Sequence, residues 1–300
     1  MSRPPDPPPG HPAAVDPPRP AVVEAVARAI AEDVLPLGDL TASLVAEEAT
    51  ASFDIVSRGR GVIAGRACAL EVLRQTDPSL CADWLIGDGG TVSPGDVVAR
   101  VSGPLRPMLT AERTVLNFLG HLSGVATVTR RYVDAVAAAN PACRILDTRK
   151  TTPGLRSLEK AAVRAGGGHN HRASLSDAVL VKDNHLAGVT IYEAVGRARQ
   201  RWPGRMVEVE CDRRDQVAEA VAAGATVIML DNMTPEEVAV CAPEVHAAGG
   251  LVEVSGGVGL ERAPLLAAAG ADLISVGALT HSAPVLDVAF DLPAGAGREG

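Results

Sequence analysis

The chain has 300 residues, enough for two domains, and 47% of them are hydrophobic. Its net charge is −8 and only 2% of its residues are aromatic, which excludes the basic surface and the aromatic array of a nucleic-acid-binding protein. No apolar run reaches the length of a membrane span, and no secretory signal is recognisable. We therefore expect a cytoplasmic protein whose partners are neither nucleic acid nor a membrane.

The first twenty residues and the cysteines suggest no chemistry. Residues 1–20 hold nine prolines, a composition typical of a disordered or polyproline-like tail. The five cysteines are odd in number, and none of them form the C-x-x-C spacing of a redox or zinc motif. We expect reduced cysteines that serve as packing residues.

Residues 21–125 predict a small α+β domain. Apolar residues recur at helical spacing up to Pro36, where the first helix should end. Residues 50–65 alternate in polarity and carry β-branched side chains, which predicts a hairpin. A helix over 67–75 follows, and residues 88–103 then predict strands divided by a Ser-Pro-Gly-Asp turn.

Two helices are expected to link this domain to the next. Thr110 has the side chain of an N-cap, and apolar residues follow it on one helical face. Ser123-Gly124 is predicted to break that helix. A second helix then runs to about Ala139.

After Asn140 the chain alternates between short β-rich runs and Ala-rich helices. Such βα repeats predict parallel strands and an α/β barrel, and the repeats are too few for an eight-stranded barrel. A further short strand is expected within 168–173. The predicted strands are Arg144–Thr148, Ala178–Lys182, Met206–Glu210, Val227–Leu230, Leu251–Val254 and Leu273–Val276.

A cluster of basic residues lies between Leu146 and His185, in a chain that is acidic overall. Such a concentration of positive charge predicts a local anion site rather than a nucleic-acid-binding surface. Both His185 and His281 could contact a phosphate or cap a helix, and His169 is expected in a loop. Surface positions are expected for Arg156, Lys160 and Arg164. The other basic residues of the cluster are Arg149, Lys150, His171, Arg172 and Lys182.

The carboxyl ends of the predicted strands should carry the chemistry, as in other α/β barrels. The glycine turns Ser255-Gly256-Gly257 and Gly277-Ala278 would let backbone N–H groups approach a phosphate. Glu210 and Asp231 end neighbouring strands. They could bind a divalent cation, hold sugar hydroxyls or stabilise a developing positive charge.

At these residues the chain closely resembles the quinolinate phosphoribosyltransferase family, also called nicotinate-nucleotide pyrophosphorylases (carboxylating). The resemblance runs from about residue 22 to residue 290, in the expected order. The matching strings are GDLT at 38–41, LTAERT at 109–114, LSG at 122–124, DTRKTTPGLRSLEK at 147–160, GGGHNHR at 166–172, VKDNH at 181–185, EVE at 208–210, LDN at 230–232, SGG at 255–257 and VGALTHS at 276–282.

The resemblance implies a fold, a reaction and partners. The fold would be a small α+β open-faced sandwich domain over 21–125, then an incomplete, seven-stranded α/β barrel over 126–283. Residues 284–300 would pack back on the first domain. The enzyme would join quinolinate to 5-phosphoribosyl-1-pyrophosphate (PRPP) with Mg²⁺ as cofactor, giving nicotinate mononucleotide, pyrophosphate and CO₂ for de novo NAD biosynthesis. It would act as a homodimer with shared active sites, or as a hexamer of such dimers.

The resemblance also implies a role for each site residue. The quinolinate carboxylates would be bound by Arg149, His171, Arg172 and Lys182, with Arg113 from the other subunit. The PRPP phosphates would be lined by Thr148, Lys150, Ser255, Gly256, Gly257, Val276, Gly277, Ala278 and His281. Glu210 and Asp231 would hold the ribose and Mg²⁺, and together with Lys150 they would be the catalytic residues.

Three other functions compete with this one. The pyrophosphorylase-like protein encoded with molybdate transporters is similar in several of these strings, but the cations around His171 favour a dicarboxylate. A barrel that only binds a phosphorylated metabolite would have no use for both Glu210 and Asp231. An aldolase would use Lys182 as a Schiff base, although Asp183 beside it indicates no desolvated pocket.

Overall fold

The computed structural model describes residues 16–292, so most of the Pro-rich segment predicted over 1–20 lies outside the described residues. The chain divides into two compact units. The first contains the residues up to 130, 152–167 and those from 279 onward; the second contains 131–151 and 168–278. No helix within 16–292 is both long and apolar enough to cross a membrane.

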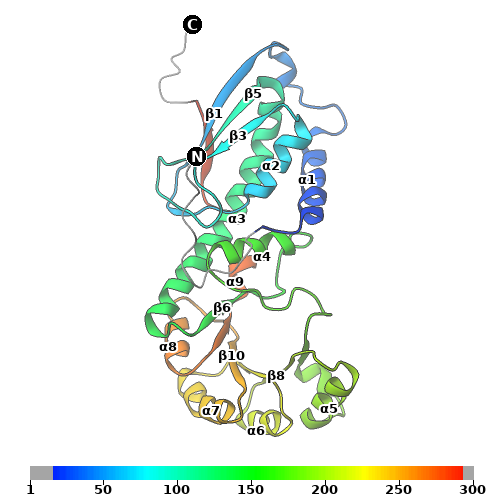
Figure 1. Cartoon of the computed structure of the whole chain (residues 1–300), viewed down its shortest axis with the longest axis vertical. Helices are drawn as coiled ribbons and strands as arrows, with labels where there is room; N and C mark the ends of the chain where they lie inside the picture. The colour runs from blue at the N-terminus through cyan, green and yellow to red at the C-terminus, as the bar shows by residue number, and fades with distance from the viewer. Residues whose placement is uncertain (1–15, 293–300) are drawn as a thin grey trace. The chain divides into compact units, whose positions relative to one another are not determined.

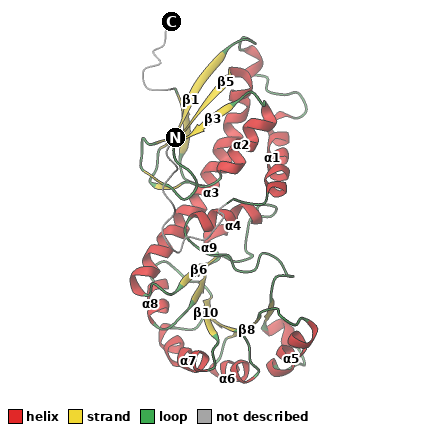
Figure 2. Cartoon of the chain, viewed as in Figure 1, coloured by secondary structure: helices red, strands yellow, loops and turns green. Residues whose placement is uncertain are grey.

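The first unit is built on an antiparallel sheet with the strand order β12-β1-β5-β3 (Figure 2). The last described strand therefore pairs with the first one of the chain. Two further short strands, β2 (Gly61–Val62) and β4 (Thr91–Val92), pair with each other. The four strands of the main sheet are β1 (Thr50–Ser57), β3 (Cys81–Trp84), β5 (Val97–Pro104) and β12 (Val288–Asp291).

The hairpin predicted over 50–65 is wrong. Both edges of β1 are taken, one by β5 and the other by β12, and β2 pairs with β4 instead. Alternating polarity indicates that a segment is a strand with one buried face, but it carries no information about which strand becomes its neighbour.

Helices cover this sheet and pack on one another. Figure 1 shows α1 and α2 side by side, and α1 also contacts α4. The first helix ends two residues before Pro36, as predicted. The helical segments of the first unit are α1 (Arg19–Val34), the 3₁₀ turn η1 (Ala42–Leu44), α2 (Arg66–Thr76), α4 (Arg156–Ala165) and most of α3 (Leu105–Ala139); the short helix α9 (Ala278–His281) begins at the unit boundary.

Helix α3 is continuous where the sequence predicted an N-cap and a break. Thr110 lies inside the helix, and its hydroxyl donates to Asp39 Oδ2 at 3.0 Å. Ser123 is fully buried, and its hydroxyl accepts from the backbone N–H of Ala64 and donates to the carbonyl of that residue. Both side chains therefore make tertiary contacts with segments that are distant in the sequence, and the local sequence pattern cannot predict such contacts.

Gly124 allows another segment to approach α3 closely. A Cβ atom at this position would lie 2.1 Å from the carbonyl oxygen of Pro284. No side chain tolerates such a contact without movement of the backbone. The glycine that looked like a helix breaker is thus explained by packing.

The second unit is a parallel sheet with the strand order β6-β11-β10-β9-β8-β7. All six strands predicted here are present. The further strand expected within 168–173 is reduced to a single parallel bridge between His169 and Leu146. The strands are β6 (Arg144–Leu146), β7 (Val179–Val181), β8 (Val207–Cys211), β9 (Val227–Asp231), β10 (Leu251–Ser255) and β11 (Leu273–Ser275).

Helices pack on the outside of this sheet, where Figure 1 shows α6 and α7 beyond β8 and β10. Two of the helices, α5 and α7, begin with capping boxes that satisfy free backbone N–H groups. The helical segments are η2 (Asp183–Leu186), α5 (Ile191–Arg201), α6 (Arg214–Ala222), α7 (Pro235–Ala247) and α8 (Ala263–Ala268).

Alternation along each strand decides which side chains enter the barrel. In β8, Val207 and Val209 are buried apolar residues, while Glu208 and Glu210 point to the opposite face. The same alternation places Glu253 and Ser255 of β10 on the face opposite the apolar Val254. The inner face of this sheet is therefore polar at the carboxyl ends of its strands.

We predict that Gly124→Ala destabilises the protein by about 1–3 kcal/mol, because the added Cβ collides with Pro284. The matched control is Gly196→Ala in α5, where a Cβ meets nothing within 4 Å. It should stabilise by about 0.5–1 kcal/mol through helix propensity alone. Urea denaturation of both variants measures the difference, and equal stability of the two would contradict the close approach at Gly124.

Candidate active site

A cavity of about 440 Å³ opens at the carboxyl ends of the parallel strands. Such strand ends form the active-site face of α/β barrels. Most of the site residues predicted from the sequence meet here. The predicted residues that line the cavity are Thr148, Arg149, Lys150, His171, Arg172, Lys182, Glu210, Asp231, Ser255, Gly256 and Gly257.

Other predicted residues are not in the lining. Val276 donates its backbone N–H to the carbonyl of Leu146 at 2.9 Å, so the sheet uses this group. Gly277 and Ala278 follow it and are also outside the lining. Arg113 and His281 belong to the first unit, and their roles stay predictions.

Four lining residues were missed: Leu180, Met229, Asn232 and Ser275. Leu180 precedes Lys182 by two positions, and Met229 precedes Asp231 by two. Because side chains alternate along a strand, the period of two could have found both residues. They add an apolar surface to a polar cavity.

Opposite charges meet at the cavity wall. Lys182 Nζ forms an ion pair with Glu210 Oε2, and both side chains are only partly exposed. Asp231, on the next strand, accepts a hydrogen bond from Asn232 Nδ2 at 2.7 Å. Each carboxylate thus keeps a second oxygen for other partners.

Two turns fit closely together behind these carboxylates. Asn232 has φ = 58°, a left-handed conformation that asparagine tolerates better than most residues, and its N–H donates to the carbonyl of Ser255. A Cβ at Gly256 would lie 2.2 Å from the side-chain oxygen of Asn232. Gly256 is therefore required for the approach of the two turns, as well as being available to a ligand.

The guanidinium groups of Arg149 and Arg172 repel each other. Burial, followed by the charge of Arg149, lowers the pKa of Arg172 below its ordinary value. A side chain that lies among like charges gains when an anion binds between them. The cavity is thus organised to receive negative charge.

Of two other basic residues, His185 takes one of the two roles expected for it, and Lys160 contradicts its expectation. His185 Nδ1 accepts the backbone N–H of Lys182 at 2.9 Å, so this histidine caps the turn η2. Lys160 is buried, and its prediction as a surface charge is wrong. The reason is that α4 is packed on nearly all sides, with Leu158 and Glu159 also buried. Arg156 and Arg164 are half-buried.

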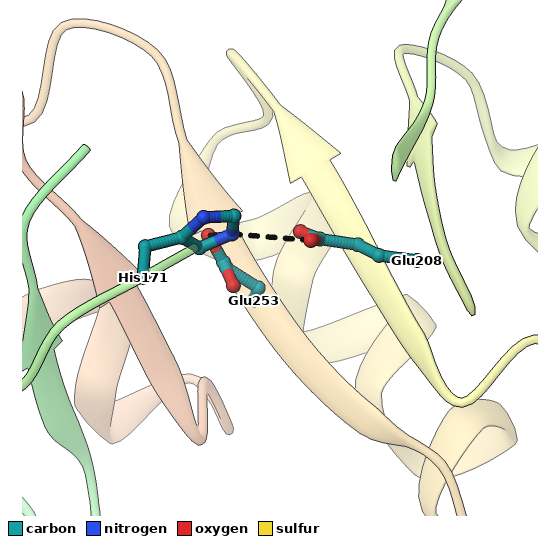
Figure 3. A group of neighbouring side chains, drawn as sticks. All are labelled: His171, Glu208 and Glu253. Atoms are coloured by element: carbon teal, nitrogen blue, oxygen red, sulfur yellow. Dashed lines mark hydrogen bonds and ion pairs between the residues drawn. The ribbon is translucent and has the colours of Figure 1, made fainter. Parts of the chain in front are cut away.

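His171 is held by buried carboxylates that the sequence analysis did not single out (Figure 3). Its Nε2 lies 3.1 Å from Glu208 Oε2 and 3.5 Å from Glu253 Oε1. Its backbone N–H donates to Asp147 Oδ1 at 2.9 Å. Burial, and then the charge of Glu208, raise the pKa of Glu253 to about 8. Glu208 lies two positions before Glu210, the same period-two signal that locates Met229.

Two family models match the chain. That of the quinolinate phosphoribosyl transferase N-terminal domain matches residues 39–123, and that of the C-terminal domain matches 125–291. The chain belongs to the quinolinate phosphoribosyl transferase family. The resemblance seen in the sequence strings is thereby confirmed.

Relatives from several organisms match along nearly the whole length of this family member. A probable nicotinate-nucleotide pyrophosphorylase (carboxylating) of Bacillus subtilis strain 168 is 43% identical over 258 residues, covering 85% of this chain and 88% of the relative. The corresponding protein of Mycobacterium leprae is 41% identical over 281 residues, covering 91% and 97%. The solved structure of the nicotinate-nucleotide pyrophosphorylase from Francisella tularensis has a TM-score of 0.86 and 36% identity, covering 91% of this chain and 96% of that one. The predicted fold class is confirmed.

Proposed function

We propose that the protein joins quinolinate to PRPP in this cavity and releases pyrophosphate and CO₂, leaving nicotinate mononucleotide. The observation that carries the proposal is the meeting of four cations with two carboxylates in one cavity. Both substrates are polyanions, so a site for them needs an excess of positive charge. The named relatives in Bacillus subtilis and Mycobacterium leprae are nicotinate-nucleotide pyrophosphorylases, which supports the same reaction.

Quinolinate would bind where the planar donors and the apolar residues meet. Arg149, His171 and Arg172 offer N–H groups that suit the flat geometry of a carboxylate. Leu180 and Met229 offer apolar contact to the face of an aromatic ring. Lys182 would add a charge to the same end of the cavity.

PRPP would bind to a different set of the lining residues from those that bind quinolinate. Thr148, Lys150 and the turn 255–257 would contact its phosphates, with backbone N–H groups at the two glycines. We assign the turn 276–278 and His281 to the same phosphates. The N–H of Val276 serves the sheet, so it would not be among the donors that this turn offers.

The carboxylates of Glu210 and Asp231 would act on the ribose. As pyrophosphate departs, the ribose carbon acquires oxocarbenium character, and these two anions would stabilise the new positive charge. The pyridine nitrogen then forms the bond to that carbon. In the adduct, the cationic ring accepts the electron pair that CO₂ leaves behind, and a proton replaces CO₂ on the ring carbon.

The donor set of the cavity fits Mg²⁺. Glu210 and Asp231 are oxygen ligands on neighbouring strands, and Mg²⁺ is commonly bound by one or two carboxylates together with substrate phosphates. When bound, the ion would neutralise part of the charge on the leaving pyrophosphate. Lys182 would keep its role as the protein's own counter-charge to Glu210.

We also propose a cytoplasmic homodimer, or a hexamer of such dimers, in which Arg113 acts at the partner's site. The family resemblance is the support for the shared site. All five cysteines are free thiols, four of them buried, which suits a reducing compartment.

The aldolase alternative is disfavoured by the environment of Lys182. A Schiff-base lysine needs a desolvated, uncharged amine, whereas Lys182 is paired with Glu210 and is 39% exposed. The alternative from molybdate-transport clusters finds no counterpart among the named relatives given above.

We predict that the purified protein forms nicotinate mononucleotide from quinolinate and PRPP only when Mg²⁺ is present. Nicotinate should be converted at least about a hundredfold less efficiently, because it lacks one of the two carboxylates that the cations bind. Chromatography of the products, with CO₂ release counted in parallel, measures both. Equal turnover of the two acids would contradict the proposed substrate.

The variant Asp231→Asn should lower kcat with little change in KM for quinolinate, because Asp231 would act on the ribose and not on quinolinate.

We predict that Arg113→Ala and Lys150→Ala, each nearly inactive alone, regain activity when the subunits are mixed. In a mixed dimer one site would carry both defects and the other neither. Random exchange makes about half of the dimers mixed, so roughly a quarter of wild-type activity should return. If Arg113 acts within its own chain, every site keeps a defect. Absence of recovery, with exchange verified by mass spectrometry of tagged subunits, would exclude the shared site.

A further inference from the structure

A second cavity, of about 590 Å³, lies beside the active site and has no task in the proposed reaction. All of its lining residues belong to the second unit. Two of them, Arg172 and Leu180, also line the active-site cavity, so the two cavities are neighbours. We call it the edge cavity. It is lined by the consecutive residues 178–181 together with Arg172, Leu175, Ser176, His185, Trp202 and Arg205.

The edge cavity runs along the open edge of β7. This strand ends the order of the parallel sheet and has β8 as its neighbour. Side chains of a strand alternate between its two faces, so a space that touches residues 178–181 in succession must lie against the edge of the strand. Val179 donates its backbone N–H to the carbonyl of Met206 at 3.0 Å, on the β8 side. The backbone groups of Leu180 therefore point toward the open edge.

Side chains of the protein already occupy this edge on both sides of Leu180. Arg172 Nη1 donates to the carbonyl of Ala178 at 3.4 Å, and the backbone N–H of Lys182 donates to His185 Nδ1 at 2.9 Å. An added strand would need a row of available backbone groups. Since the edge offers the groups of one residue, the cavity suits a small molecule better than a peptide strand.

The wall of the edge cavity favours negative charge. Arg172, Arg205 and His185 are among its residues, and none of the described residues that line it is acidic. Asp177 lies next to the lining, and its carbonyl accepts a hydrogen bond from Arg205 at 3.3 Å. The carboxylate of Asp177 is held by its own loop, where it accepts the backbone N–H of Ala173 at 2.7 Å. It offsets part of the charge of Arg205, and the wall stays cationic.

The apolar part of the wall is open to solvent. Leu175 is 71% exposed and Trp202 is 54% exposed. Large apolar side chains gain free energy when a ligand removes them from water, and an aromatic ring adds the most contact area. The volume of the cavity is within the range of small-molecule sites in proteins.

We propose that the edge cavity is a second ligand site, which takes a small amphipathic monoanion. The apolar ring or chain of the ligand covers Leu175 and Trp202. Its single carboxylate or sulfonate faces Arg172 and Arg205. The polar groups of the ligand that lie along the edge of β7 bind the backbone of Leu180.

The edge cavity and the active site are coupled, because one guanidinium group cannot fully pair two anions. Arg172 lines both cavities, so an anion in one weakens the binding of an anion in the other. Thermodynamic linkage makes the factor the same in both directions. The ligand site does not depend on the proposed function. The coupling rests on it, because it needs quinolinate at Arg172.

The fluorescence of Trp202 reports on the edge cavity directly. The chain has two tryptophans, so Trp84→Phe leaves Trp202 as the only one. Trp84 Nε1 has no hydrogen-bond partner within the described residues, so phenylalanine removes no such bond. The probe is 4-cyclohexylbutyrate, which is optically silent and carries one carboxylate on an apolar body. It should shift the emission of Trp202 to shorter wavelength, and the neutral 4-cyclohexylbutanamide should bind at least about fivefold more weakly.

Two arginine variants, both made in the Trp84→Phe protein, test the charge of the wall. Arg205→Ala should weaken binding of the probe about threefold or more, because it removes one cation. The matched control is Arg197→Ala, which removes an exposed arginine of α5 outside the lining and should bind the probe as Trp84→Phe does. Neither residue belongs to the proposed active site, so quinolinate should bind both variants with unchanged affinity.

Calorimetric titration with quinolinate at rising probe concentrations measures the coupling. The dissociation constant of quinolinate should rise at least about threefold and then level off, because both ligands can be bound at once. A probe that competed within the active site would raise this constant without limit. A protein that binds no quinolinate even without the probe would refute the proposed function, while the emission of Trp202 would still test the edge cavity.

Five results would overturn the inference. The first three are an unchanged emission of Trp202, equal binding of the acid and the amide, and equal probe affinity of Arg205→Ala and Arg197→Ala. The fourth is a quinolinate dissociation constant that rises without limit. The fifth is a Trp202 that acrylamide cannot quench in the assembled protein, which would mean that a second copy of the chain covers the edge cavity.

Discussion

Repulsion among cations that share one cavity is the constraint on which this site depends. Arg149 and Arg172 both line the cavity and lie close enough for one to lower the pKa of the other; Arg149 follows β6, and Arg172 follows the segment bridged to β6 at His169. Two kinds of negative charge offset the free-energy cost of placing these guanidinium groups side by side. Carboxylates on β8 and β9 supply counter-charge, and a polyanionic substrate would supply the rest. A protein with an overall charge of −8 thus holds a strongly cationic cavity.

The inward-facing residues form two layers, because side chains of a strand return to the same face every second position. Lys182, Glu210, Asp231 and Ser255 make the layer that lines the cavity mouth. Leu180, Glu208, Met229 and Glu253 lie two positions earlier and make the layer beneath it. The upper layer would contact substrates. The lower layer supports it with the apolar side chains of Leu180 and Met229 and the buried carboxyl groups of Glu208 and Glu253. This arrangement explains why glutamates two residues apart, Glu208 and Glu210, have different surroundings.

The sequence predicted the parts of the fold that depend on local pattern. All six strands of the second unit were recognisable from β-rich runs between Ala-rich helices, and their ends identified most of the cavity lining. The hairpin at 50–65 and the break at Gly124 were wrong for one shared reason. Strand partners and the approach of Pro284 are contacts with distant segments, about which local pattern is silent. Glu208 and Glu253 were missed because an acidic residue within a strand looks like a solvent-facing one until the sheet closes around it.

The central claim is that the cations of the cavity recognise two adjacent carboxylates, and the most direct test is calorimetric titration of the substrate-free protein with phthalate. Phthalate carries two neighbouring carboxylates on a ring without the reactive nitrogen, so it isolates charge recognition from chemistry. The account predicts one site per chain, with an affinity that falls as salt is raised because the attraction is between charges. It also predicts at least about tenfold weaker binding of benzoate, which has a single carboxylate. Equal affinity for phthalate and benzoate, or binding that salt leaves unchanged, would contradict it.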